Sequence, residues 1–382
     1  MTAGPLDGLL VADFSRVLAA PYLTMLLGDL GADVVKVERP GTGDDTRAWG
    51  PPYDDGEATY TLSVNRNKRS VSLDLATSEG RRAARELALR ADVLIENFRP
   101  GTMARLGLDE ESLRDGNPGL VHCSLSGFGD GPGAALPGYD LLVQATGGLM
   151  SITGPGPGQP TKVGVALVDV LAGLHAGIGV LSALRHRDRT GEGQAVALDL
   201  LSTLLSSMTN QAGAHTMTGA VPGIMGNRHP SIAPYEVFPA ADRPIALAVG
   251  TDRQFRSLAD ELGRPELADD ARFATNTARV AHVDELAAVL GSLLAAHTAD
   301  EWFARLTPRG VPCGPVNDLG EAFRLAEDLQ LAPRVTVGGR DLVANPIRLA
   351  ATPVSYRRPP PRLGEHTDEI TRWLAPVAEE VS

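Results

Sequence analysis

Cysteine and aromatic residues are scarce in this chain of 382 residues. Its two cysteines, Cys123 and Cys313, are far apart in the sequence, which excludes a disulfide framework and a zinc site built from cysteines. Aromatic residues make up only 4% of the chain, and no basic stripe is interleaved with them. Binding of nucleic acid needs cations for the phosphates and rings for base stacking, so we do not expect nucleic acid as a partner.

An excess of positive charge is also lacking, since 35 Lys and Arg residues face 47 Asp and Glu residues, for a net charge of −12. An anionic ligand must therefore be held by a few local cations. No basic residue precedes the first apolar run, so we expect no signal peptide and a cytoplasmic location. Only residues 163–184 approach the length of a membrane span, and they include Asp169, His175 and four glycines. We therefore expect a buried helix there and no membrane partner.

Several familiar catalytic motifs are missing. Gly129, Gly131 and Ala134 match G-x-G-x-x-A, but Pro132 and Pro137 interrupt the helix that would hold a dinucleotide. No phosphate-binding P-loop and no G-x-S-x-G turn of a serine hydrolase is present. The histidines are scattered without a ligand spacing such as H-E-x-x-H, so we expect no metal site.

Short apolar runs alternate with helical segments through the first 200 residues. The predicted strands are residues 8–15, 33–37, 70–75, 92–96, 120–125 and 194–198, and the predicted helices include 21–30, 78–91 and 200–217. Fully apolar strands are typical of a parallel sheet that helices cover on both faces. The sequence predicts an α/β fold whose large domain is Rossmann-like and spans residues 1–220.

A second, smaller domain of α+β type is predicted for residues 221–325. Residues 219–234 are dense in glycine and proline, which marks the boundary. A strand at 245–250 is followed by helices at 252–262, 282–297 and 302–306, and Thr298 with Glu301 forms a capping box before the last one. The proline-rich tail, residues 326–382, is expected to return to the large domain and complete it.

Asp169 is a lone carboxylate within an apolar helical stretch. An ionised group costs several kcal/mol to bury unless it is paired or used in chemistry. From position alone, a catalytic role and a helix-capping role both remain open. Tyr139 and Asp140 precede another apolar helical run, where a carboxylate can simply favour the helix dipole. His175 lies six residues after Asp169 and faces another direction, so we expect a core or interface histidine.

Several segments, in order along nearly the whole chain, resemble the class III CoA-transferases, also called the CaiB/BaiF family. The resemblance is carried by residues 13–21 (DFSRVLAAP), 30–47 (LGADVVKVERPGTGDDTR), 65–71 (NRNKRSV), 91–101 (ADVLIENFRPG), 126–129 (SGFG), 226–235 (GNRHPSIAPY), 310–318 (GVPCGPVND) and 363–367 (LGEHT). It implies an acyl-CoA:carboxylate CoA-transferase, and Asp169 matches the family's nucleophilic aspartate. Tyr139 and Asp140 match further catalytic positions. No permanently bound cofactor is implied, because coenzyme A enters and leaves as a substrate.

The resemblance also implies where coenzyme A binds and how the chain assembles. Arg16, Arg39, Asn97, Phe98 and Arg105 match coenzyme-A-contacting positions along the large domain. Arginine suits this role because its guanidinium can hold a phosphate through two hydrogen bonds. Known members are interlocked homodimers, so the resemblance implies a homodimer here.

Two other functions remain open. The family includes α-methylacyl-CoA racemases, which use a histidine where this chain has Tyr139. A tyrosine is a weak base at neutral pH, so this difference favours transfer over racemisation. A non-catalytic protein that binds CoA esters is disfavoured by the intact Asp169. Leu18 replaces a glutamine of formyl-CoA:oxalate transferases, whereas residues 226–238 resemble succinyl-CoA-dependent enzymes acting on dicarboxylates. The acceptor acid and the role of Glu236 are left open.

Overall fold

The computed structural model describes residues 4–375 and divides into two compact units. The larger unit contains the chain up to Leu149, Val163–Ala220 and the chain from Ala332 onward. The smaller unit contains Met150–Lys162 and Val221–Leu331. The units thus differ from the two predicted domains in residues 150–162 and 326–331, which belong to the smaller unit.

A six-stranded, fully parallel sheet forms the centre of the larger unit, which confirms the predicted α/β fold with a parallel sheet. Its strands are β1 (Leu10–Asp13), β2 (Asp33–Glu38), β5 (Lys68–Ser72), β6 (Val93–Glu96), β7 (Val121–Ser126) and β8 (Ala195–Asp199). Strand β5 begins before the predicted strand because Lys68, although charged, is fully buried beside Asp13. Because Lys68 and Arg69 are charged, the apolar pattern alone could not assign them to the strand.

The order of the strands, β5-β2-β1-β6-β7-β8, reverses direction between β1 and β6. This is the order of the doubly wound dinucleotide-binding fold. In such sheets, ligands bind at the carboxyl ends of the strands on either side of the reversal. The loops that follow β1 and β6 are therefore the expected ligand-binding loops.

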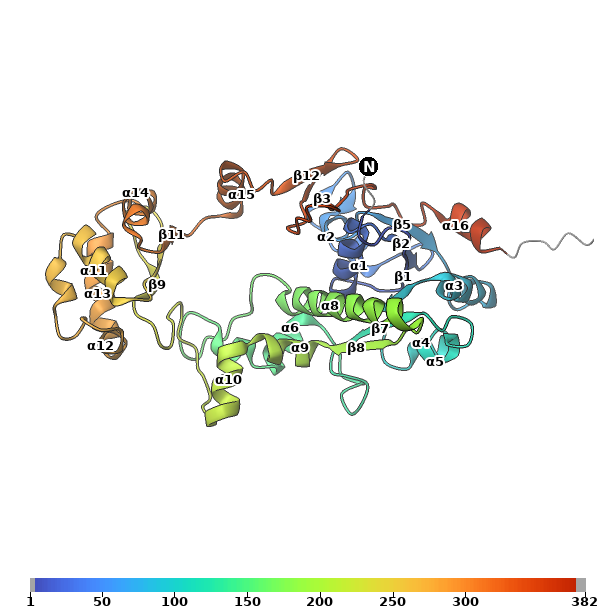
Figure 1. Cartoon of the computed structure of the whole chain (residues 1–382), viewed down its shortest axis with the longest axis horizontal. Coiled ribbons are helices and arrows are strands. Elements are labelled where there is room, and N and C mark those ends of the chain that lie inside the picture. Colours follow the sequence, from blue (N-terminus) through green and yellow to red (C-terminus); the bar gives the residue numbers. More distant parts are fainter. Residues whose placement is uncertain (1–3, 376–382) are drawn as a thin grey trace, which may run out of the picture. The chain divides into compact units, whose positions relative to one another are not determined.

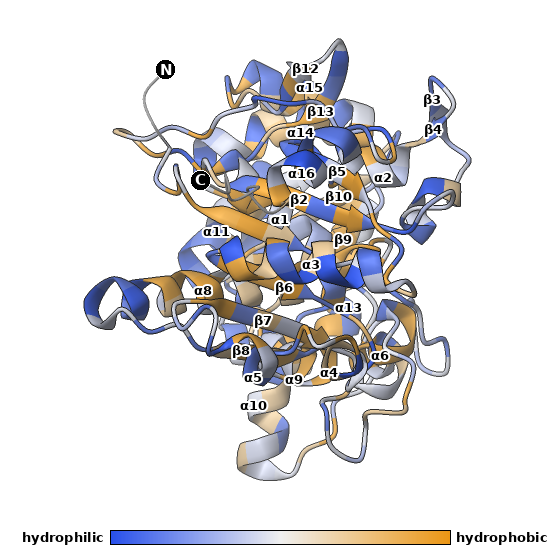
Figure 2. Cartoon of the chain, turned by 90° about the vertical axis from the view of Figure 1, so that its right-hand side faces the viewer, coloured by the Kyte–Doolittle hydropathy of each residue, from blue (hydrophilic) through white to orange (hydrophobic). Residues whose placement is uncertain are grey.

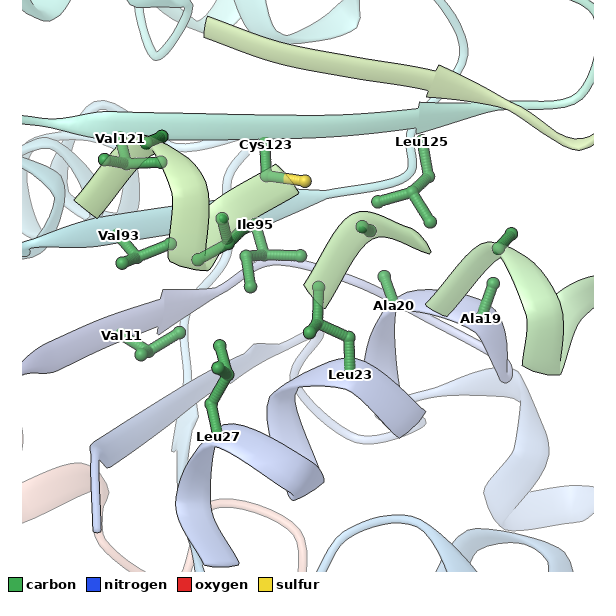
Figure 3. Packing of buried hydrophobic residues seen from close by; sticks show 14 of the residues in the cluster. Val11, Ala19, Ala20, Leu23, Leu27, Val93, Ile95, Val121, Cys123 and Leu125 are labelled. Atoms are coloured by element: carbon green, nitrogen blue, oxygen red, sulfur yellow. The ribbon is translucent and has the colours of Figure 1, made fainter. Parts of the chain in front are cut away.

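Helices cover both faces of the sheet (Figure 1). Helices α1 (Ala19–Asp29), α8 (Leu167–Thr190) and α9 (Leu200–Ser207) pack on one face, and α3 (Ser78–Arg90) and α16 (Thr367–Leu374) pack on the other. Figure 3 shows Leu23 and Leu27 of α1 on the side of the helix that faces Val11, Val93 and Ile95 of the sheet. The remaining elements of this unit are η1 (Asp45–Ala48), β3 (Tyr53–Asp54), β4 (Glu57–Ala58), α2 (Thr59–Ser63), α4 (Thr102–Leu106), α5 (Glu110–Leu113), α6 (Asp140–Thr146), α10 (Thr209–Thr218), β12 (Arg334–Val337) and β13 (Arg340–Val343).

Helix α8 is only half buried in the single chain. Ala172, Ala176 and Val180 pack inward, while Ile178 is 65% exposed and belongs to an apolar stripe with Leu174 and Leu181. Figure 2 shows apolar colouring over much of α8. Among residues 4–375, it is the one helix whose length and composition would allow a membrane span. The prediction of a buried helix holds for one face and is wrong for the other.

The smaller unit has a three-stranded antiparallel sheet, ordered β11-β10-β9, with helices packed around its own apolar core. Its elements are β9 (Tyr235–Phe238), β10 (Ile245–Ala248), α11 (Asp252–Glu261), η2 (Pro265–Ala268), α12 (Asn276–Ala281), α13 (Val283–Leu294), α14 (Ala299–Leu306), η3 (Thr307–Arg309), β11 (Cys313–Pro315) and α15 (Leu319–Asp328). The short helix α7 (Leu149–Ile152) begins at the division along the chain. The predicted capping box of Thr298 and Glu301 is present at the start of α14.

The C-terminal segment packs on the larger unit around one buried carboxylate, that of Asp29. Arg66 donates to it from Nε and from a terminal nitrogen, at 2.9 and 2.6 Å, and the amides of Asn67 and Asn345 donate at 2.8 and 3.0 Å. Arg357, in the proline-rich tail, donates to the carbonyl of Ala32 at 2.7 Å. The tail therefore returns to the large domain as expected.

We expect Asp29→Ala to lower the free energy of unfolding by about 3–5 kcal/mol, because it leaves the buried Arg66 guanidinium without its counter-charge. Urea unfolding followed by circular dichroism measures the loss. Arg114→Ala removes a largely exposed pair with Glu110 and should cost less than about 1 kcal/mol. Equal losses in the two variants would contradict the structural role of Asp29.

Candidate functional site

The two loops at the reversal of strand order are joined by the side chain of Asn97. Its Nδ2 donates to the carbonyl of Arg16 at 2.7 Å, and its Oδ1 accepts from the backbone N–H of Arg16 at 2.8 Å. Asn97 follows β6, whereas Arg16 follows β1. These bonds engage both polar ends of the amide, so Asn97 holds the Arg16 loop against the β6 loop.

Two neighbouring cavities in the larger unit meet at Arg16 and Phe98, which line both. The Arg16 guanidinium lies over the Phe98 ring, 5.2 Å from its centroid. The first cavity contains Asp169 and is called the Asp169 cavity below. The second is lined by Arg39 and is called the Arg39 cavity. A long ligand that passes Phe98 can thus occupy both.

Asp45 joins the two arginines of this region. Its carboxylate lies 2.5 Å from a terminal nitrogen of Arg39 and 3.4 Å from one of Arg16. All three side chains are between 37% and 56% exposed, so solvent screens these ion pairs and each contributes little to stability. A phosphate can therefore compete with Asp45 for either guanidinium at low energetic cost.

A fully buried ion pair, formed by Lys36 and Asp44, holds the backbone of the loop that contains Arg16. Lys36 donates from Nζ to Asp44 at 3.0 Å and to the carbonyl of Ser15 at 2.8 Å. Asp44 also accepts from the backbone N–H of Val17, which has a left-handed φ of 69°. Burial acts to lower the pKa of Lys36, but Asp13 and Asp44 together raise it above its usual value. The lysine consequently stays charged and stabilises the loop conformation.

Arg105 lies on α4 and lines neither of these two cavities. Its guanidinium donates to the hydroxyl of Thr102 at 2.9 Å, and Thr102 lines the Arg39 cavity. The structure thus brings Arg16, Arg39, Asn97 and Phe98 together around the two cavities, with Arg105 farther along α4. A role for Arg105 in binding coenzyme A stays a prediction.

Asp169 lies in the first turn of α8 and is only 9% exposed. Within residues 4–375, its carboxylate oxygens accept no hydrogen bond, so Asp169 does not cap a helix. Burial, and then the neighbouring charge of Asp140, raise its pKa from 3.8 to about 7. A carboxylate that is desolvated and faces a cavity is poised to attack an electrophile.

Asp140, the first residue of α6, performs the capping role. Its Oδ1 accepts from the backbone N–H groups of Val168 and Asp169, at 2.8 and 3.3 Å. Its Oδ2 accepts from the amide of Gln144 at 2.5 Å, and Gln144 in turn accepts from the backbone N–H of Val163 at 2.9 Å. The sequence suggested that Asp140 acts on the dipole of its own helix. In the structure it also fixes the start of α8, and thereby Asp169.

Two tyrosines lie near these carboxylates. Tyr139 precedes α6, lines the Asp169 cavity and is 59% exposed. Tyr60 on α2 was not among the residues singled out from the sequence, because no motif connects it to Asp169. Burial, and then the charges of Asp169 and Asp140, raise its pKa to about 12. The Tyr60 phenol therefore stays protonated and can act as a hydrogen-bond donor.

Glu236 lies on β9 of the smaller unit, and its carboxylate pairs with Nε of Arg228 at 3.2 Å. Arg228 also pairs with Asp284 at 2.6 Å. These contacts explain Glu236 as part of a local ion-pair network. Among residues 4–375, no cluster of three or more His, Cys, Asp or Glu side chains could hold a metal ion.

Comparison with known proteins places these features in a family. Residues 6–367 match the model of CoA-transferase family III. The succinate–glutarate CoA-transferase of Agrobacterium fabrum is 44% identical, covering 98% of this chain and 96% of its own length. The succinyl-CoA:glutarate CoA-transferase of Mus musculus is 38% identical, covering 96% and 86%. The acetyl-CoA:oxalate CoA-transferase of Acetobacter aceti is 41% identical, covering 98% and 97%.

Solved structures agree with the sequence comparison. The crystal structure of a CaiB/BaiF family protein from Brucella suis superposes with a TM-score of 0.90 at 41% identity, covering 98% of this chain and all of that one. The chain thus combines a parallel sheet of reversed strand order with two cavities that meet at Arg16 and Phe98. A desolvated aspartate lines one of these cavities, and residues 6–367 match one enzyme family. The protein belongs to CoA-transferase family III.

Proposed function

We propose that the protein transfers coenzyme A from succinyl-CoA or a similar donor to a small carboxylic or dicarboxylic acid, with Asp169 as the nucleophile. The observation that carries this proposal is the Asp169 carboxylate, which is buried, accepts no hydrogen bond within residues 4–375 and lines a cavity. Water would stabilise the charge of a carboxylate and weaken it as a nucleophile. Burial removes that stabilisation and raises the pKa of Asp169 to about 7.

The proposed reaction has four steps. An Asp169 oxygen attacks the thioester carbonyl of the donor, the carbon–sulfur bond breaks, and a mixed anhydride and the CoA thiolate form. The thiolate attacks the Asp169 carbonyl, which produces an aspartyl-CoA thioester and releases the donor acid as a carboxylate. The acceptor carboxylate then attacks this thioester, forming a second anhydride and again the thiolate. Attack of the thiolate on the acceptor's acyl carbon completes the transfer and restores the Asp169 carboxylate.

The two cavities suit the two ends of an acyl-CoA. The Arg39 cavity is lined by apolar residues such as Phe14, Leu73 and Leu75 beside the Arg39 guanidinium, which suits an adenine and its phosphates. The thioester end would pass Phe98 and reach Asp169.

The choice of donor follows from the relatives. The Agrobacterium and mouse proteins are named for succinate or succinyl-CoA and glutarate, and the Acetobacter protein is named for acetyl-CoA and oxalate. All three names contain a dicarboxylic acid. We therefore propose a dicarboxylic acid as acceptor, with succinyl-CoA as the first donor to test.

We also propose that the enzyme is a homodimer and works in the cytoplasm. The resemblance to interlocked family members implies the dimer. The exposed apolar stripe of Leu174, Ile178 and Leu181 on α8 supports it, because a stripe of this kind is stable when another protein surface covers it. Size-exclusion chromatography with light scattering measures the oligomeric state directly.

Trapping tests the nucleophile. After brief incubation with succinyl-CoA, hydroxylamine should convert the anhydride or thioester at Asp169 to a hydroxamate, which peptide mass spectrometry locates. Asp169→Asn is the control and should carry no hydroxamate and lose transfer activity. An unmodified Asp169 in a protein shown to bind succinyl-CoA would argue against this donor. Exchange of the α-proton of an acyl-CoA in deuterium oxide would then indicate a racemase.

The pH profile tests the environment of Asp169. Because burial and Asp140 raise the pKa of Asp169 to about 7, the carboxylate is protonated and inactive at low pH. We expect kcat/KM to rise about tenfold per pH unit between pH 5 and pH 6.5 and to level off above pH 7.5. Steady-state assays over pH 5–9 measure this. A midpoint near pH 4 would show that solvent reaches the carboxylate.

Two variants of Asp140 separate the effect of its charge on Asp169 from the effect of its hydrogen bonds to the start of α8. Asp140→Asn keeps an oxygen that can accept from Val168 and removes the charge, so the midpoint of the pH profile should fall while kcat stays within about tenfold. Asp140→Ala also removes the cap and should cost about 1 kcal/mol of stability and lower kcat further. Identical pH midpoints in wild type and Asp140→Asn would contradict the electrostatic effect.

A further inference from the structure

The Asp169 cavity is lined by four charged side chains, two of them cations, and one of these cations has no ion-pair partner within residues 4–375. The four are Arg16, Asp45, Arg99 and Asp169. Arg16 pairs with Asp45 and lies over Phe98. Asp169 is the reacting group. Arg99 is exposed, and within residues 4–375 its guanidinium forms no hydrogen bond and no ion pair.

The position of Arg99 distinguishes it from the other cations of the site. Arg39 and Lys36 line only the Arg39 cavity, and Lys36 is buried against Asp44. Arg16 lines both cavities, whereas Arg99 lines only the one that contains Asp169. The backbone of Arg99 is held in a turn, because its carbonyl accepts from the N–H of Thr102 at 3.0 Å. The loop therefore presents a free guanidinium on the acyl side of Phe98.

We propose that Arg99 binds the second carboxylate of a dicarboxylic substrate and so selects dicarboxylic over monocarboxylic acids. This inference rests on the proposed transfer reaction. A dicarboxylic acid uses one carboxylate in the reaction and carries the other into the cavity as a spectator. That second charge is repelled by Asp169 and by the net charge of −12 unless a cation compensates it. Arg99 is the unpaired cation in place, and a guanidinium holds a carboxylate through two parallel hydrogen bonds.

The test compares two acceptors of equal carbon number, glutarate and valerate, with succinyl-CoA as donor. In Arg99→Gln, we expect kcat/KM for glutarate to fall at least tenfold, mainly through KM, and kcat/KM for valerate to change less than twofold. Arg99→Lys keeps the charge but not the paired hydrogen bonds, so it should restore part of the glutarate activity. Arg82→Gln removes an exposed arginine of α3 outside the Asp169 and Arg39 cavities and serves as the matched control.

Three results would overturn the inference. An equal loss with glutarate and valerate would show that Arg99 contacts coenzyme A or a group common to both acids. No loss with either would show that Arg99 is only a solvated surface charge. In both cases wild-type transfer and the hydroxamate at Asp169 would leave the proposed function standing. A wild-type enzyme that transfers to neither acid and forms no hydroxamate would instead remove the proposed function together with this inference.

Discussion

The burial of one carboxylate, that of Asp169, is the constraint on which the site depends. An unpaired charge in a poorly hydrated place is costly, so the surroundings must fix it there. Asp140 does so indirectly, since it binds the backbone N–H groups at the start of α8 and leaves the Asp169 oxygens free. Burial, and then the charge of Asp140, raise the pKa of Asp169 to about 7. Asp140 thus contributes both to the position of Asp169 and to its pKa.

The order of the strands places a cavity beside this aspartate. Strand order reverses between β1 and β6, so the loops carrying Arg16 and Phe98 diverge and leave a crevice at the carboxyl ends of the strands. Asn97 joins the two loops, and the buried Lys36 and Asp44 support the one that contains Arg16. In dinucleotide-binding proteins of this topology, a glycine-rich turn holds the pyrophosphate. Here the glycine motif is absent, and the side chains of Arg16 and Arg39 line the cavities at the crevice.

Local cations matter because the chain as a whole is acidic. Arg16 and Arg39 share the exposed carboxylate of Asp45, a pairing that solvent screens and a phosphate can displace. Arg66 and Arg279, in contrast, are buried and bound to several acceptors, so they stabilise the fold and are not available to a ligand. The number of partners and the exposure of each guanidinium separate the arginines that are available to a ligand from the structural ones.

The sequence by itself determined the parallel α/β fold and the family, and it singled out Asp169 as the candidate nucleophile, because apolar strands, turn residues and short motifs are local features. Only the tertiary structure decided the relations that depend on contacts between segments far apart in the sequence. Asp140 appeared as a charge that favours the dipole of its own helix, yet it binds the start of α8, 28 residues away. Tyr60 carried no motif that linked it to Asp169, Arg99 stood in the segment 91–101 without an assigned role, and α8 gave no sign that only one face would pack. Such relations depend on which helices and loops the folded sheet brings together, and local spacing along the chain does not contain that information.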